Sequence, residues 1–346
     1  MNLKAWWRAC ALVLLAACGL DAGSASAADA DLIQAAQSEG RVVWYTGLII
    51  DQLSRPMAEA FEKAYGIKVE IVRANSSETV LRISNEAKAG QLFADVFDTT
   101  TGAPALKRLG YVERFIPKSA SHYAKEAVDP EGYWTGINVY VQSAARNTEL
   151  VPDGVAPRTW EEFLDPRWRG RFVWSSSLSP GGAIGFIATV LKEYGEDRGM
   201  AYLQKLSAQQ ITSIEAAGRA VTDQIIAGEY ALGLQIFNNQ PAAAARTGAP
   251  IANLPVQPAT ASLNTMSVTK GAPHPHAARL FAEFVTSKEG QQLISARDYV
   301  PAAPDVPAKD PSLKPDGVTF RAIFFTPEDL EASVPRLAAI YKQLFR

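Results

Sequence analysis

The chain has 346 residues, of which 47% are hydrophobic and 20% are charged, and its formal net charge is −2 at pH 7. This is the composition of a globular protein, and the lack of a basic excess argues against nucleic-acid binding. A chain of this length forms one large or two medium domains, because single hydrophobic cores stop growing at roughly 250 to 300 residues.

The first 27 residues have the order of a secretory signal peptide. Lys4 and Arg8 stand near its start, a short apolar run covers 9–17, and small residues close it at 25–27. The run is too short to span a bilayer, and no later stretch approaches the roughly 20 apolar residues that a spanning helix needs. We therefore expect a soluble protein exported to the periplasm.

Two processing sites stay open. Cleavage before Ala28 fits the small residues at 25–27, whereas 15–19 resembles a lipobox, in which Cys18 would be lipidated and would tether the protein as a lipoprotein. Cys10 and Cys18 are the only cysteines. A chain that starts at Ala28 has no thiol, and so no disulfide, cysteine nucleophile or thiolate metal ligand.

Strand and helix patterns alternate after the export segment. Apolar runs predict strands at 41–45, 68–72 and 94–97. Helices with apolar stripes and capping residues are predicted between them, from Leu53 to Gly66, from Asn75 to Gly90 and up to Gly110. In the second helix we expect Val80, Leu81, Ile83 and Ala87 to lie mostly on one side. This order predicts a parallel sheet with right-handed crossovers.

A second segment repeats the pattern. The expected elements are an amphipathic turn at 159–164, a strand at 171–174, helices at 183–194 and 220–226, and a strand at 230–235. Extended stretches near 134–145 and 255–269 would join the two segments as hinge strands. We therefore predict two α/β lobes that close on a ligand, lobe 1 with 28–135 and about 262–300, and lobe 2 with 136–261 and about 301–346. The helix from Pro327 is expected to pack against one lobe.

The loops after the strands are the candidate binding residues. Ligands of open α/β sheets bind beyond the carboxyl ends of the strands, where helix N-termini favour anions. These loops supply Tyr45, Thr46, Gly47, Ser76, Ser77, Thr99, Thr100, Thr101, Ser175, Ser176, Ser177, Ser179, Gly181, Gly182, Phe237, Asn238 and Asn239.

The stretch Ser175–Gly182, which we call the serine loop, offers hydroxyl donors and glycines that admit a ligand close to the backbone. It is either a cradle for a carboxylate, phosphate or phosphonate, or a solvated turn that caps a helix. Arg219 is either a bidentate anion ligand or a surface residue. Tyr45, Tyr140 and Phe237 either stack on an organic ligand or fill the lobe interior.

Several kinds of chemistry are not indicated. His122, His274 and His276 are the only histidines, and none lies in these loops, so we expect surface capping by His274 and His276 and no metal site. Asp95 and Asp98 are three apart in an extended segment, which puts them on opposite faces. No nucleophile elbow, Walker lysine or dinucleotide fingerprint is present, so we expect neither an enzyme nor a cofactor.

The motifs together resemble one family. The sequence is similar to the ferric-ion-binding-like family of bacterial solute-binding proteins, on the signal peptide and on 43–47, 94–98, 159–162, 165–170, 228–233, 270–275 and 287–290. The resemblance implies a type II periplasmic binding protein fold, with the ligand in the cleft between the lobes. It also implies an ABC permease in the inner membrane as partner.

The resemblance bears on the ligand too. Iron-binding members have two adjacent tyrosines where this chain has Asn238 and Asn239, and Ser76 and Ser77 stand where they have an acid. In relatives that bind no iron, the region of the serine loop receives an acid group. We therefore predict a monomeric receptor for a small anionic organic solute, with a ferric receptor that uses exogenous anions and an exported hydrolase or lyase as alternatives.

Overall fold

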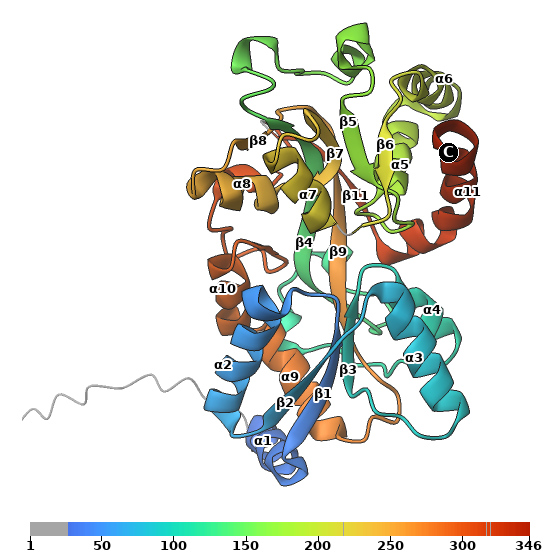
Figure 1. Ribbon diagram of the computed structural model, residues 1–346. Helices are drawn as coiled ribbons and strands as arrows, with labels where there is room; N and C mark the ends of the chain where they lie inside the picture. The colour runs from blue at the N-terminus through green and yellow to red at the C-terminus, as the bar shows by residue number, and fades with distance from the viewer. Residues whose placement is uncertain (1–26, 217, 316, 319) are drawn as a thin grey trace, which may run out of the picture.

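The computed structural model describes residues 27–346 apart from 217, 316 and 319. One mixed sheet runs through two stacked lobes in the strand order β2-β1-β3-β9-β4-β7-β5-β6 (Figure 1). β1, β2 and β3 belong to lobe 1, at the bottom of the view, and β5, β6 and β7 belong to lobe 2 at the top. The α/β class and the two-lobed architecture predicted from the sequence are confirmed.

Lobe 1 contains three parallel strands with helices on both sides. The strands are β1 (Arg41–Thr46), β2 (Lys68–Arg73) and β3 (Val96–Thr99). The helices of its first half are α1 (Ala27–Glu39), α2 (Arg55–Tyr65), α3 (Ser76–Lys88) and α4 (Gly102–Arg108), with a π-helical turn at Ile50–Ser54 before α2. Asn75 accepts a hydrogen bond from the Glu78 amide at 3.0 Å and completes a capping box, so α3 begins where predicted.

Two long antiparallel strands pass from one lobe to the other. They are β4 (Thr135–Asn147) and β9 (Ala259–Val268). β9 pairs with β3 in lobe 1, and β4 pairs with β7 in lobe 2. These are the hinge strands expected near 134–145 and 255–269. We propose the lobe boundaries given above on this basis.

Lobe 2 repeats the architecture. Its strands are β5 (Phe172–Ser175), β6 (Thr212–Ile214), β7 (Leu232–Phe237) and β8 (Ile251–Asn253). Its helices are α5 (Ala183–Tyr194), α6 (Glu196–Ser207), α7 (Gly218–Ile226) and α8 (Asn239–Arg246). The strand predicted at 230–235 begins and ends two residues later, and the turn predicted at 159–164 is a single 3₁₀ turn, Glu161–Leu164.

The C-terminal part returns to both lobes. It forms α9 (Pro275–Thr286), α10 (Lys288–Ala296), β10 (Val300–Pro301), β11 (Ala322–Phe325) and α11 (Pro327–Phe345). The expectation that α11 packs against one lobe is too narrow, because α11 packs on α5 of lobe 2 and also contacts α4 of lobe 1. Glu331 pairs with Arg108, and Glu328 Oε1 accepts a hydrogen bond from Trp134 Nε1 at 2.9 Å.

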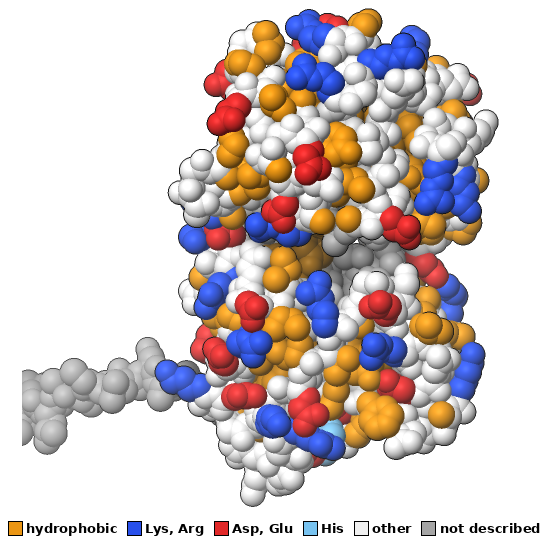
Figure 2. Space-filling model, viewed as in Figure 1, with side chains coloured by type: hydrophobic (Ala, Val, Ile, Leu, Met, Phe, Trp, Pro, Cys, Tyr) orange, Lys and Arg blue, Asp and Glu red, His pale blue; other side chains and the backbone are white. Residues whose placement is uncertain are grey.

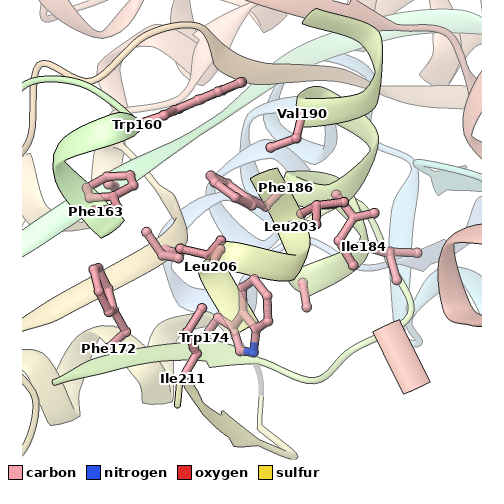
Figure 3. Close-up of a cluster of buried hydrophobic side chains, with 14 of the residues drawn as sticks. Trp160, Phe163, Phe172, Trp174, Ile184, Phe186, Val190, Leu203, Leu206 and Ile211 are labelled. Carbon is pink, nitrogen blue, oxygen red and sulfur yellow. The ribbon is translucent and has the colours of Figure 1, made fainter. Parts of the chain in front are cut away.

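Aromatic side chains anchor the core of each lobe. Trp174 on β5 and Phe186 on α5 lie in the core of lobe 2 with Trp160, Phe163 and other apolar residues (Figure 3). In lobe 1 the Phe281 ring of α9 packs against Trp44 and Phe61, at centroid distances of 5.1 and 5.0 Å. Burial of these side chains stabilises the positions of β1 and β5. The candidate binding loops follow the ends of these two strands.

Two local expectations are wrong. Leu81, grouped with Ile83 on one side of α3, is 61% exposed, because the buried face is made by Thr79, Ile83 and Ser84. The His274 side chain does not cap α9. Its Nδ1 lies 2.8 Å from Asp95 Oδ2 and its Nε2 accepts a hydrogen bond from Arg41, so it joins the start of α9 to the sheet of lobe 1.

None of the helices in the described part of the chain combines the length and the apolarity that a membrane crossing requires. The export segment predicted at residues 1–27 lies outside the described residues except for Ala27.

Candidate functional site

A cleft of about 690 Å³ lies between the two lobes. It opens beyond the carboxyl ends of β1, β3 and β5, and the molecular surface narrows and is hollowed at this level (Figure 2). Most of the candidate binding residues line it: Gly47, Ser76, Ser77, Thr99, Thr100, Thr101, Tyr140, Ser175, Ser176, Ser177, Ser179, Gly181 and Phe237. The loops of two segments far apart in the sequence therefore share one cleft.

Three candidates from lobe 2 lie outside this wall. Arg219 is exposed and bonds its Nε to Asp223 Oδ1 at 2.9 Å, one turn along α7, which is an ordinary surface pair. Asn238 is buried and donates its Nδ2 to the Leu313 carbonyl at 2.8 Å. Asn239 begins α8. Asn238 therefore holds the loop at Leu313, and Asn239 is the first residue of α8, and neither of them lines the cleft.

Three other candidates support the wall from behind. The Tyr45 hydroxyl donates to Glu86 Oε1 at 2.6 Å in the interior of lobe 1. Thr46 is fully buried, and its Oγ1 accepts a hydrogen bond from the Leu48 amide at 3.0 Å. Gly182 is the N-cap residue of α5, directly after the wall residue Gly181. These residues shape the loops that the ligand would meet.

The serine loop is held by its own hydroxyls. Ser175 donates to the Ala216 carbonyl at 2.6 Å, and Ser176 donates to the Ile214 carbonyl at 3.1 Å. Ser177 donates to Ser179 Oγ at 3.0 Å. Since these protons are used within the protein, the loop is tied to the segment after β6 rather than left as a freely solvated turn.

Two helices begin at the lobe 2 wall. α5 starts after Gly182, which gives it no side-chain cap, and α7 starts at the wall residue Gly218. The first turn of a helix has unpaired amides and a partial positive charge. Both helices are long enough for this charge to develop, so the lobe 2 wall suits an anionic group.

Phe237 joins the two helix starts. A Cβ atom on Gly181 would lie 2.6 Å from the ring of Phe237, and one on Gly218 would lie 3.1 Å from it. On the hinge side the ring meets Tyr140 edge-on, with 5.1 Å between the ring centroids. A side chain at 181 would force the Phe237 ring or the serine loop to shift, and one at 218 would meet the ring closely.

The floor of the cleft in lobe 1 is an organised polar cluster that includes Asp98. Its carboxylate accepts hydrogen bonds from Trp44 Nε1 and Asn264 Nδ2, both at 2.9 Å, and from the Gly47 amide at 3.4 Å. Burial raises the pKa of Asp98 to about 6, although these donors favour its ionised form. The cluster joins β1, β3 and β9 and fixes the backbone that lines the cleft.

Hydroxyls complete the lobe 1 wall. Ser76 Oγ accepts a hydrogen bond from the Thr100 amide at 3.2 Å, which joins the start of α3 to the loop after β3. Thr99 Oγ1 is buried and has no hydrogen-bond partner among the described residues. Burial, assisted by the nearby Tyr299 and Asp98, raises the pKa of the Tyr140 phenol far above its usual value, so Tyr140 stays a neutral donor.

The candidate residues from the sequence do not include every part of the wall. Asn75, Asp98, Leu178, Glu215, Ala216, Gly218, Asn264 and Arg346 also line the cleft. Asn264 carries a detectable signal, because it is an amide in a hinge strand that is buried along its whole length. Arg346, at the end of α11, lines the cleft with its guanidinium carbon 5.7 Å from the centroid of the Tyr341 ring, and no pattern in the sequence places it there.

The donor set does not form an evident metal centre. In the part of the chain that the structure describes, no group of three or more His, Cys, Asp or Glu side chains is placed to hold a metal ion. The side-chain carboxyl groups of the wall belong to Asp98 and Glu215, and the Asp98 oxygens already accept hydrogen bonds from Trp44, Asn264 and Gly47.

Comparisons with known proteins identify the family. Residues 56–318 match the family described as bacterial extracellular solute-binding protein. The chain is 26% identical over 296 residues to the Fe(3+)-binding periplasmic protein of Serratia marcescens. The aligned residues cover 82% of this chain and 84% of the Serratia protein.

Solved structures share the fold. Iron-bound HitA from Pseudomonas aeruginosa is 23% identical with a TM-score of 0.72, and the match covers 88% of this chain and 99% of HitA. AfuA from Actinobacillus pleuropneumoniae, solved with fructose 6-phosphate, is 23% identical with a TM-score of 0.73, over 88% of this chain and 98% of AfuA. The expected type II periplasmic binding protein fold is confirmed. The chain belongs to the bacterial extracellular solute-binding protein family, and it is the periplasmic solute-binding component of an ABC importer.

Proposed function

We propose that this protein captures a small organic solute with an acid group, a carboxylate, phosphonate or phosphate ester, and delivers it to its permease as a monomer without chemical change. The observation that carries the proposal is the lobe 2 wall, where α5 and α7 begin side by side beside the serine loop. Amides at helix starts bind anions in many proteins without a cationic side chain.

The cleft has the chemistry of a bifunctional ligand. The serine loop and the two helix starts would hold the acid group, with Arg346 as the cation of that wall. On the opposite side, the hydroxyls of Ser76, Ser77 and Thr99–Thr101 would bond to polar groups of the ligand body. Tyr140 and Phe237 would cover its apolar part. AfuA, with fructose 6-phosphate bound, is a protein of the same fold that takes a ligand of this kind.

Ferric ion is the alternative that the relatives raise. Ferric ion prefers charged oxygen ligands, and the amides and hydroxyls of this wall bring no negative charge. Asn238, at one of the two positions where iron-binding members of the family have tyrosine, is buried and already bonded to the Leu313 carbonyl. These observations favour the organic anion over the metal.

A ligand screen tests the proposal. The melting temperature of the purified mature protein is measured with carboxylates, phosphonates, sugar phosphates and ferric citrate, each with a matched uncharged analogue. A ligand at 100 times its Kd stabilises by about 2.7 kcal/mol. We expect stabilisation by at least one organic anion and none by its uncharged analogue.

The other outcomes are distinct. If ferric ion alone shifts the melting temperature and produces a visible charge-transfer band, the organic-anion proposal fails and the iron alternative holds. Steady conversion of any compound in the screen, followed by product analysis, would instead identify a hydrolase or lyase.

A further inference from the structure

A buried chain of hydrogen bonds connects the hinge strand β9 to the serine loop. Thr260 Oγ1 on β9 donates to Gln235 Oε1 on β7 at 3.1 Å. Gln235 Nε2 donates in turn to the carbonyl of Pro180, in the middle of the serine loop, at 2.8 Å. Thr260 and Gln235 are 2% and 3% exposed, so neither reaches the solvent or lines the cleft.

The chain continues to the helix that the serine loop precedes. Thr260 Oγ1 lies 2.6 Å from Thr189 Oγ1 on α5, and Thr189 Oγ1 lies 2.9 Å from the Gly185 carbonyl. The Thr189 hydroxyl donates its proton to the Gly185 carbonyl or to Thr260, while Thr260 donates to Gln235 and one amide proton of Gln235 goes to the Pro180 carbonyl. A buried hydrogen-bond network of this kind favours one arrangement of the groups that it joins.

Gln235 and the Pro180 carbonyl lie close to the first turn of α5 at Gly185. A Cβ atom on Gly185 would lie 1.9 Å from the Pro180 oxygen and 2.3 Å from Gln235 Nε2. Gln235 itself has a φ of 58°, a backbone conformation that residues other than glycine and asparagine rarely adopt. Such a conformation persists where the surroundings impose it, and it is found at functional positions more often than elsewhere.

We infer that Gln235 and Thr260 are positioning residues, which set the anion affinity of the cleft from the hinge strand without touching the ligand. Gln235 holds the Pro180 carbonyl and thereby the backbone of the serine loop, and Thr260 fixes the amide orientation of Gln235. The inference rests on the proposed function, since it takes the serine loop as the acid-group site. The position of the loop can nevertheless be measured without any ligand.

Three variants provide the test. Thr260→Val removes the hydroxyl and keeps the shape, and Thr260→Ser keeps the hydroxyl. Thr135→Val is the matched control, because Thr135 is 2% exposed on the other hinge strand and its Oγ1 has no hydrogen-bond partner among the described residues. Circular dichroism confirms that each variant is folded before further measurements.

The first measurement is hydrogen exchange of the amides at 176–184 in the protein without ligand. The second is the Kd for inorganic phosphate, used as the simplest acid group. We expect Thr260→Val to speed the exchange and to raise the Kd, each about tenfold, which corresponds to about 1.4 kcal/mol. Thr260→Ser should restore both values, and Thr135→Val should leave both unchanged.

Two results would overturn the inference. One is unchanged exchange at 176–184 in Thr260→Val, and the other is an equal effect of Thr135→Val, which would indicate a general loss of hinge packing. If phosphate and the organic anions of the screen fail to bind the wild-type protein, the proposed function fails instead. The exchange data still decide whether Thr260 positions the loop.

Discussion

Asn264 on β9 donates its Nδ2 to Asp98 Oδ1 on β3 at 2.9 Å, between residues 166 positions apart in the chain. This contact places a buried carboxylate on the floor of the cleft and ties it to the hinge strand. Since Trp44 and Gly47 bond to the same carboxylate, its protonation state affects the loop after β1 as well as the hinge.

The raised pKa of Asp98 gives a testable dependence of stability on pH. The pKa is about 6 in the folded protein against 3.8 for a free aspartate, so the folded state retains this proton over a range in which the unfolded state has lost it. The contribution of Asp98 to stability is therefore fully present below pH 4 and falls as the pH rises to 6. The pKa difference corresponds to about 3 kcal/mol.

Asp98→Asn removes this titration. We expect the free energy of unfolding of the wild type to fall by about 2 kcal/mol relative to Asp98→Asn between pH 4 and pH 6.5. Urea unfolding at four or five pH values measures it. Asp51→Asn, at a surface carboxyl that is 87% exposed, is the control. A constant difference between wild type and Asp98→Asn would contradict the assignment.

The contact of Phe237 with Gly181 predicts that even a methyl group at 181 disturbs the site. Gly181→Ala places a Cβ atom 2.6 Å from the Phe237 ring, which must move or push the serine loop away. Overpacking of this kind costs about 1 to 3 kcal/mol. We expect anion affinity to fall about tenfold or more in isothermal titration, while the protein remains folded.

Gly154→Ala is the control for this substitution. A Cβ atom there meets nothing within 4 Å, so affinity and melting temperature should both stay at their wild-type values. If Gly181→Ala binds the best anion of the screen as the wild type does, then the serine loop does not hold the acid group.

Arg346 and Arg219 form a natural pair for testing charge at the cleft. Arg346 lines the cleft, whereas Arg219 is outside the wall and bonded to Asp223. We expect Arg346→Ala to weaken anion binding several-fold and to reduce its dependence on ionic strength, because an exposed charge at a binding site acts through screened attraction. Arg219→Ala should leave both unchanged in titrations at 20 and 200 mM salt. The reverse result would mean that Arg219 turns into the cleft when the ligand is bound.

Local sequence signals predict most of the fold. The capping box of Asn75 with Glu78 and the left-handed Gly66 after α2 involve neighbours in the chain, and both helix ends are found as expected. The apolar runs that form β1 and β5 are similarly direct, because each strand is buried on both faces. Leu81 is misplaced because helix periodicity identifies an apolar stripe without showing which neighbour covers it.

The site is only partly predictable, since its chemistry depends on contacts between distant segments. The loops after β1, β3 and β5 are expected at one edge of the sheet, and their residues do meet in the cleft. Asp98 lines the floor of the cleft, where its carboxylate bonds to partners on β1 and β9. The spacing between Asp95 and Asp98 in the sequence does not predict these partners. Asn238 does not line the cleft, because its side chain donates a hydrogen bond to the Leu313 carbonyl, 75 residues further along the chain.

The mature N-terminus is the remaining prediction, and it concerns residues outside the described part of the chain. We expect cleavage before Ala28, which removes only the first residue of α1 (Ala27–Glu39) and leaves that helix free to pack on α9. Intact mass spectrometry of the protein from a periplasmic extract measures it, with Cys18→Ser as the control. Processing before Ala28 should give one mass that Cys18→Ser does not alter. A heavier species that carries acyl chains, and that disappears in Cys18→Ser, would show instead that Cys18 is the mature N-terminus and that the receptor is tethered to the membrane.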